Sequence, residues 1–107
     1  MIVEMRTYTI HPGTAPAYFK VYETMGMEVQ KEILGHMVGY YVTEIGELNQ
    51  VVHMWAYDSL DNRTERRAKL IQDERWKKML PELRKFIISQ KTQILIPAPF
   101  AQIPKIN

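Results

Sequence analysis

Hydrophobic and polar residues alternate along several short stretches of this chain. Residues 2–10, IVEMRTYTI, alternate with period two and include β-branched side chains, which is typical of a strand. Similar patterns predict strands over residues 36–45, 50–58 and 89–96. Residues 46–49, Gly-Glu-Leu-Asn, predict a short turn, so we expect the second and third strands to form a hairpin.

Two longer stretches have the spacing of helices. Residues 15–34 place apolar side chains three or four positions apart, and Gly35 follows as a residue that readily ends a helix. Residues 60–72 predict a more polar helix, and Asp73 restarts the pattern in a more apolar stretch. We expect Pro81 to kink or restart that second stretch, because proline lacks an amide donor.

The predicted order is strand, helix, strand, strand, helix, strand. This order indicates an α+β, ferredoxin-like βαββαβ fold with a four-stranded antiparallel sheet and both helices on one face. A chain of 107 residues predicts one domain, which we place at residues 1–97. Residues 98–107 form a proline-rich tail, and we expect Phe100 and Ile103 to anchor it against a second subunit.

The alternation also suggests which side chains face the helices. In residues 50–58, the small apolar row of Val52, Met54 and Ala56 is expected to pack against them. The face away from the helices would then carry Glu4, Arg6, Tyr8, His53, Trp55 and Tyr57. For residues 36–45, either the row of Tyr40 or the row of Tyr41 could face the helices.

An outward face of this composition is too aromatic to remain in water. We therefore expect two sheets to pack face to face in a homodimer, with a partly polar cavity between them. Apolar cavities with a few convergent polar groups are where small ligands bind, so a small apolar or aromatic molecule is the expected partner.

Composition excludes several classes of function. The net charge is only +2, from 14 basic and 12 acidic residues that are interspersed, which argues against nucleic-acid binding. The absence of cysteine excludes disulfides, thiolate metal sites and cysteine nucleophiles. No stretch has the roughly 20 apolar residues of a membrane span, and the first residues, MIVEMR, lack the apolar core of a signal peptide. We therefore expect a soluble cytoplasmic protein.

The aromatic and polar row supplies the candidate chemistry. His53 is the candidate acid or base, with Arg6 as an anion partner and Tyr8 as a proton donor. The candidate ligand-binding side chains are Glu4, Tyr41, Trp55 and Tyr57. Each has a structural alternative: a satisfied buried histidine, a salt bridge between Arg6 and Glu44 or Asp58, and aromatic rings that only pack. Glu4, two residues away on the same strand, is expected to pair with Arg6 only loosely.

Metal and cofactor binding have little support. His11, His36 and His53 lie in three separate elements without the spacing of metal ligands. We expect no metal and no cofactor, although a single axial histidine, His36 or His53, leaves haem as an alternative.

Three segments resemble the NIPSNAP family: MIVEMRTYTIHPG, GYYVTEIGELNQVVHMWAYDSLDNRTERRAKL and ILIPAPF. The run from Ile45 to Ser59, IG-x-LNQVVH-x-WAYDS, is the most distinctive part. The resemblance implies a dimeric α+β barrel, in a superfamily that includes cofactor-free monooxygenases and haem proteins. It implies no settled activity, because members of the family have none.

Three functions therefore remain open from the sequence. The first is a homodimeric small-molecule-binding protein with monooxygenase-like or isomerase-like chemistry in its cavity. The second is a protein-interaction module without catalysis, and the third is a haem-binding barrel protein.

Overall fold

The computed structural model describes residues 1–101. Its elements in chain order are β1 (Ile2–Ile10), α1 (Ala15–Val21), the π-helical turn η1 (Tyr22–Gly26), α2 (Met27–Leu34), β2 (His36–Val42), β3 (Gln50–Tyr57), α3 (Leu60–Gln72), α4 (Glu74–Arg84) and β4 (Ile87–Leu95). The expected order of strands and helices is confirmed, and the predicted strand ends differ by up to three residues.

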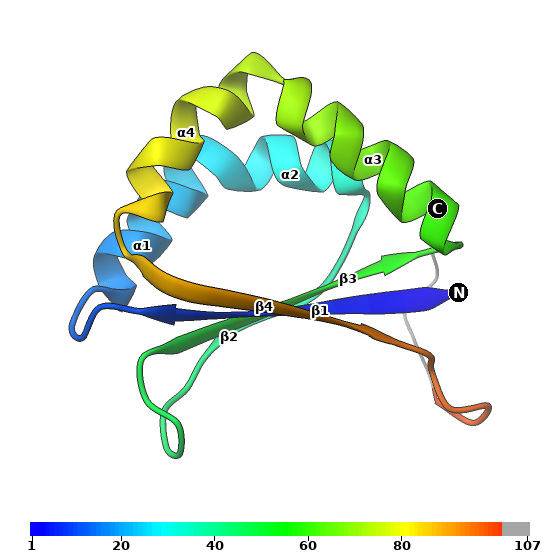
Figure 1. The fold of residues 1–107 in the computed structure, drawn as a ribbon, viewed down its shortest axis with the longest axis horizontal. Helices are drawn as coiled ribbons and strands as arrows, with labels where there is room; N and C mark the ends of the chain where they lie inside the picture. Colours follow the sequence, from blue (N-terminus) through cyan, green and yellow to red (C-terminus); the bar gives the residue numbers. More distant parts are fainter. Residues whose placement is uncertain (102–107) are drawn as a thin grey trace.

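The four strands form one antiparallel sheet in the order β2-β3-β1-β4. The helices arch over one side of this sheet, and no described element covers the other side (Figure 1). The predicted α+β, ferredoxin-like fold is thus confirmed.

The first helical stretch contains one wide turn that the sequence pattern does not reveal. In η1, the amide of Met27 donates to the carbonyl of Tyr22, a bond that spans five residues instead of four. Gly26 ends this turn and lies close to α4. A Cβ added at position 26 would be 3.0 Å from Cε of Met79. The turn directs Tyr22 into the core, where it is 5% exposed.

The break in the second helical stretch lies at Asp73, and Pro81 lies inside α4. Asp73 ends α3 and caps α4, because its side chain accepts a hydrogen bond of 2.8 Å from the amide of Arg75. The expectation that Pro81 restarts the helix is wrong. Pro81 is exposed, so water can satisfy the Lys77 carbonyl that loses its donor.

The expected facing of the sheet is also wrong. The row of Glu4, Arg6 and Tyr8 and the row of His53, Trp55 and Tyr57 face the helices. Trp55 is fully buried, and Glu4 contacts Arg63 of α3. The Glu4 carboxylate can be buried because Arg63 of α3 pairs with it. The histidine can be buried because the rings of Tyr8, Tyr40 and Trp55 contact it.

The open side of the sheet therefore carries the small apolar row. Met5 lies opposite Met54 and Thr7 lies opposite Val52 in the register of β1 and β3. Tyr41 of β2 pairs with Val52 and belongs to this side, with 54% of its surface exposed.

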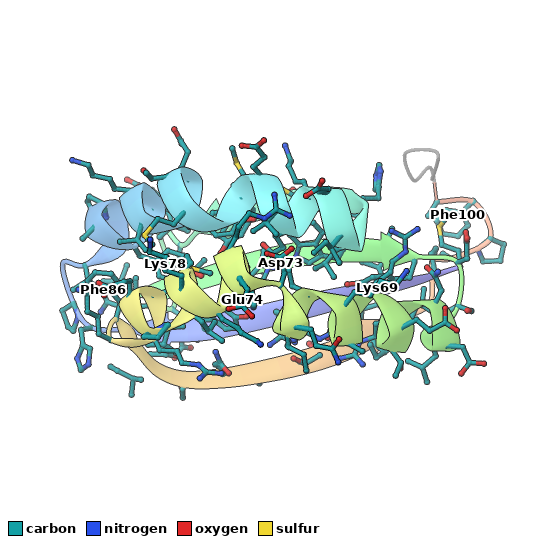
Figure 2. All side chains as sticks on the ribbon, turned by 90° about the horizontal axis from the view of Figure 1, so that it is seen from above. Lys69, Asp73, Glu74, Lys78, Phe86 and Phe100 are labelled. Atoms are coloured by element: carbon teal, nitrogen blue, oxygen red, sulfur yellow. The ribbon has the colours of Figure 1, made fainter. Side chains whose placement is uncertain are left out.

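After β4 the chain departs from the sheet, and its apolar side chains there are exposed. Ile96 is 81% exposed and Phe100 is 88% exposed. Figure 2 places Phe100 at the opposite end of the molecule from Phe86. Ile103, the second expected anchor of the tail, lies outside the described residues.

Candidate functional site

His53 lies at the centre of the helix-facing side of the sheet and is 1% exposed. Its Nδ1 accepts a hydrogen bond of 2.8 Å from Nε1 of Trp55. Its ring stacks on Tyr40 with centroids 4.5 Å apart and meets the edge of Tyr8 at 4.9 Å. Because Nδ1 is an acceptor, the neutral ring carries its proton on Nε2. That atom is buried and has no hydrogen-bond partner in the described part of the chain.

The surroundings of His53 keep it neutral. Burial, followed by the positive charges of Arg6 and Arg67, lowers the pKa of His53 to about 3. A neutral imidazole whose Nδ1 is already engaged is a hydrogen-bond donor through Nε2. The geometry therefore favours a donor role for His53 over the role of general base.

A small cavity adjoins His53 between the sheet and the helices. Its volume is about 30 Å³, enough for a water molecule but far below the roughly 300 Å³ of the smaller ligand sites. The cavity is lined by aromatic, aliphatic and amide side chains: Tyr8, Tyr18, Tyr22, Gln30, Tyr40, His53, Trp76, Leu80, Leu83, Ile87 and Gln90.

Four of the residues that line this cavity are tyrosines. The hydroxyls of Tyr18 and Tyr40 lie 2.7 Å apart, and the Tyr22 hydroxyl donates to Oε1 of Gln30 at 2.5 Å. Burial raises the pKa of Tyr18, Tyr22 and Tyr40 well above the ordinary value. The three phenols therefore stay protonated and act as donors as well as acceptors.

An apolar groove lies next to the cavity and shares two of its walls. The groove has a volume of about 180 Å³ and is lined by Phe19, Tyr22, Glu23, Met27, Met37 and Tyr40. Tyr22 and Tyr40 line both spaces. Tyr22 belongs to η1, and such π-turns are frequent at functional sites.

A charged cluster lies farther along β1, under α3. Oε2 of Glu4 accepts hydrogen bonds from Nη1 of Arg6 at 3.1 Å and from Nη2 of Arg63 at 2.7 Å. Nε of Arg6 donates to the Tyr8 hydroxyl at 2.9 Å, which links this cluster to the cavity. Burial alone would raise the pKa of Glu4, but Arg63, Arg6 and Arg67 outweigh it and lower that pKa. Arg6 thus forms its salt bridge with Glu4, and not with Glu44 or Asp58 as the sequence suggested.

Most of the predicted site residues lie together, with one exception. Glu4, Arg6, Tyr8, His53, Trp55 and Tyr57 share the helix-facing side of β1 and β3. Tyr41 lies on the opposite side and does not join them. Sequence reasoning did not assign Tyr18, Tyr22, Tyr40, Arg63 or Arg67 to the site. The spacing of four between Arg63 and Arg67 was a usable signal, because it places both on one helix face.

The site residues do not suit a haem group. The cavity that His53 lines is only about 30 Å³, and the ring of Tyr40 stacks on the imidazole. His36 lies at the start of β2, outside this cavity. Among residues 1–101, no group of three histidine, aspartate or glutamate side chains is arranged to bind a metal ion. The helices of the described residues are all too short or too polar to cross a membrane.

Comparison with known proteins identifies the family. The family model NIPSNAP matches residues 3–102. The human protein NipSnap homolog 3A is 29% identical over 105 residues, which are 95% of this chain and 41% of that protein. The chain thus spans about two fifths of the length of the curated relatives that it matches.

Solved structures agree with this assignment. A NIPSNAP family protein of unknown function from Agrobacterium tumefaciens is 48% identical, with a TM-score of 0.94 over 96% of this chain and 93% of that one. An antibiotic biosynthesis monooxygenase shares the fold at 9% identity, with a TM-score of 0.63 over 92% of this chain and all of that one. The buried histidine and the tyrosine-lined cavity lie under the helices of a ferredoxin-like sheet that these relatives share. The family model and the solved structures give one assignment: the chain belongs to the NIPSNAP family.

Proposed function

We propose that this protein binds a small molecule in the cavity between the sheet and the helices. The observation that carries the proposal is the buried Nε2–H of His53, which lacks a partner in the described residues. A buried donor without an acceptor costs about 1–3 kcal/mol. A ligand oxygen placed in the cavity would accept this hydrogen bond and remove the cost.

The ligand enters through the groove beside the cavity. The cavity alone holds about 30 Å³, but the adjoining groove adds about 180 Å³. Rotation of the rings of Tyr22 and Tyr40, which line both spaces, would join them into one pocket. The joined pocket approaches the lower end of the range for small-molecule sites, which suits a ligand of one aromatic or alicyclic ring.

The chemistry that this site supports is stabilisation of negative charge on a ligand oxygen. His53 is a neutral donor, and the tyrosines around it are protonated donors. Fixed donors aimed at a developing oxyanion are the usual means of accelerating enolate formation. That step is common to cofactor-independent monooxygenases and to keto–enol isomerases, and the fold shared with an antibiotic biosynthesis monooxygenase makes the former worth testing.

We also propose that the protein is a homodimer that pairs the open sides of two sheets. The support is the partly exposed apolar surface of that side, which includes Val52, Met54 and the ring of Tyr41. No described element of the chain covers it (Figure 1). The cavity lies on the other side, so each subunit would keep its own site.

The binding proposal is tested with a panel of small phenols and cyclic ketones, after native mass spectrometry of freshly purified protein for a retained ligand. We expect a ligand to shift the NMR signal of the Nε2 proton of His53. His53→Phe should weaken its binding at least about tenfold, because a donor with no replacement is lost. Tyr41→Phe is the matched control, since it removes an exposed hydroxyl on the other side of the sheet.

Equal ligand affinity in His53→Phe and the wild type would contradict this role of His53. No retained ligand and no binding from the panel would leave the protein-interaction module as the better function. The exposed Ile96 and Phe100 after β4 would then be the first residues to test.

A further inference from the structure

The cluster under α3 holds more positive than negative charge. Arg6 and Arg63 both bond to the single carboxylate of Glu4, which is fully buried. Arg67, one turn after Arg63, is half-buried and makes no hydrogen bond or ion pair with the described residues. Burial and the neighbouring Arg6 lower the pKa of Arg67 and outweigh the opposite effect of Glu4. Two guanidinium groups therefore bind one carboxylate, and the positive charge of a third, Arg67, acts on it without a contact.

Three polar atoms of the same cluster lack partners in the described residues. They are the hydroxyl of Tyr57, Nε of Arg63 and Oε1 of Glu4, and all three are shielded from solvent. Tyr57 is 1% exposed, and its hydroxyl stays protonated because burial raises the pKa of Tyr57 to about 12. The cluster thus offers the donors of Tyr57, Arg63 and Arg67 beside the one free acceptor atom of Glu4.

We propose that this cluster binds a small oxyanion that carries a hydroxyl group, of the hydrogen-phosphate type. The anion would balance the excess positive charge of the cluster, which the half-buried Arg67 shares only partly with solvent. The guanidinium of Arg67 can bind two of its oxygens at once, and the Tyr57 hydroxyl can donate to another. The hydroxyl of the anion would donate to Oε1 of Glu4. This site does not depend on the cavity at His53.

A water molecule could satisfy the same hydrogen bonds, but it would leave the charge excess in place. The cluster is closed by side chains that reach the surface: that of Arg63 is 23% exposed. Movement of Arg63 and Arg67 would admit the anion and then close over it.

The test measures phosphate binding by calorimetry and by thermal unfolding, at an ionic strength held constant with chloride. Sulfate is the second probe, because near neutral pH it has no hydroxyl. We expect phosphate to bind and to raise the melting temperature, and sulfate to bind at least about tenfold more weakly, since its oxygen would face Oε1 of Glu4 without a proton. Simple attraction to positive charge would give the reverse order, because sulfate carries the larger charge.

Variants assign the site. Arg67→Gln should lower phosphate affinity at least about tenfold, because a charged bidentate partner is lost. Lys69→Gln, on the same helix but exposed, removes the same charge and should leave affinity unchanged. Tyr57→Phe should lower affinity several-fold, which keeps the test decisive if Arg67→Gln fails to fold.

Three results would overturn the proposal. The first is a melting temperature that responds equally to phosphate and to chloride. The second is unchanged phosphate affinity in Arg67→Gln and Tyr57→Phe. The third is sulfate binding as tightly as phosphate, which would remove Glu4 as the acceptor of a ligand proton.

Discussion

His53 stays neutral because it is buried and lies near the positive charges of Arg6 and Arg67. The Trp55 indole occupies Nδ1, and the enclosing rings exclude water. The pKa of His53 in the folded chain is about 3, against an ordinary value of 6.5. Between these pH values His53 is protonated in the unfolded chain but not in the folded chain. The unfolding free energy therefore falls as the pH falls through this window.

From this linkage we predict a loss of about 2 kcal/mol in unfolding free energy between pH of about 7 and about 5 that is due to His53 alone. Urea unfolding of the wild type and of His53→Gln at both pH values isolates this term, because glutamine does not titrate. The wild type should lose about 2 kcal/mol more than the variant. Equal losses in the two proteins would mean that His53 is protonated in the folded state.

Single residues differ in how far the sequence reveals their roles. His53, Arg6 and Tyr8 stand out because their row mixes aromatic and charged groups within two strands. Tyr18 and Tyr22 do not, since a tyrosine in an apolar helical stripe has the same pattern whether its hydroxyl meets a cavity or a backbone. Whether such a hydroxyl meets Tyr40 or Gln30 depends on the packing of separate elements, which alternation does not encode.

At the scale of elements, the end of α2 combines backbone strain with a close contact. Gly35 has a φ of 94°, and an added Cβ would lie 2.8 Å from Nη1 of Arg66. That arginine donates a hydrogen bond of 3.0 Å to the carbonyl of Ile33 and so ties α3 to the end of α2. A side chain at position 35 would therefore strain the backbone and also displace this tie.

Gly35→Ala should lower the unfolding free energy by about 2 kcal/mol or more, from a left-handed backbone cost of about 1–2 kcal/mol and the lost contact. Gly13→Ala is the matched control, because Gly13 has a φ of 80° with nothing within 4 Å of the added Cβ. It should show the backbone cost alone. Urea unfolding measures both, and a Gly13→Ala loss as large as that of Gly35→Ala would contradict a role for Arg66.

The strands show where sequence patterns succeed and where they stop. Period-two alternation predicts β1, β2, β3 and β4 in their order along the chain, because successive side chains of a strand point to opposite faces of the sheet. It does not say which row faces the helices. The rule that the apolar row does so fails here because Arg63 of α3, together with Arg6, pairs with the buried carboxylate of Glu4. In the sequence, Arg63 belongs to a stretch that predicts only a polar helix.

At the scale of the whole molecule, the sheet separates two environments. One side holds the polar and aromatic residues of the candidate sites under the helices, and the other side holds the small apolar row. The second side is the one expected to need a partner, because exposed apolar surface of a sheet is costly in water. The reversal of the faces therefore moves the candidate cavity from between two subunits into each single subunit.

We predict that the wild type has twice the 12.6 kDa mass of one chain in solution. Met54→Lys should give a folded monomer, since Met54 lies opposite Met5 in the middle of the open side and a charge there would be buried in the dimer. Light scattering after size-exclusion chromatography measures the mass, and circular dichroism confirms folding. Ile71→Lys, an exposed apolar residue of α3 that lies away from the sheet, is the control and should remain dimeric.

A wild-type mass of one chain at micromolar concentration, or a dimeric Met54→Lys, would refute pairing through this side. Because the cavity at His53 lies on the other side, ligand binding should persist in the Met54→Lys monomer, and this separates the assembly of the protein from its site.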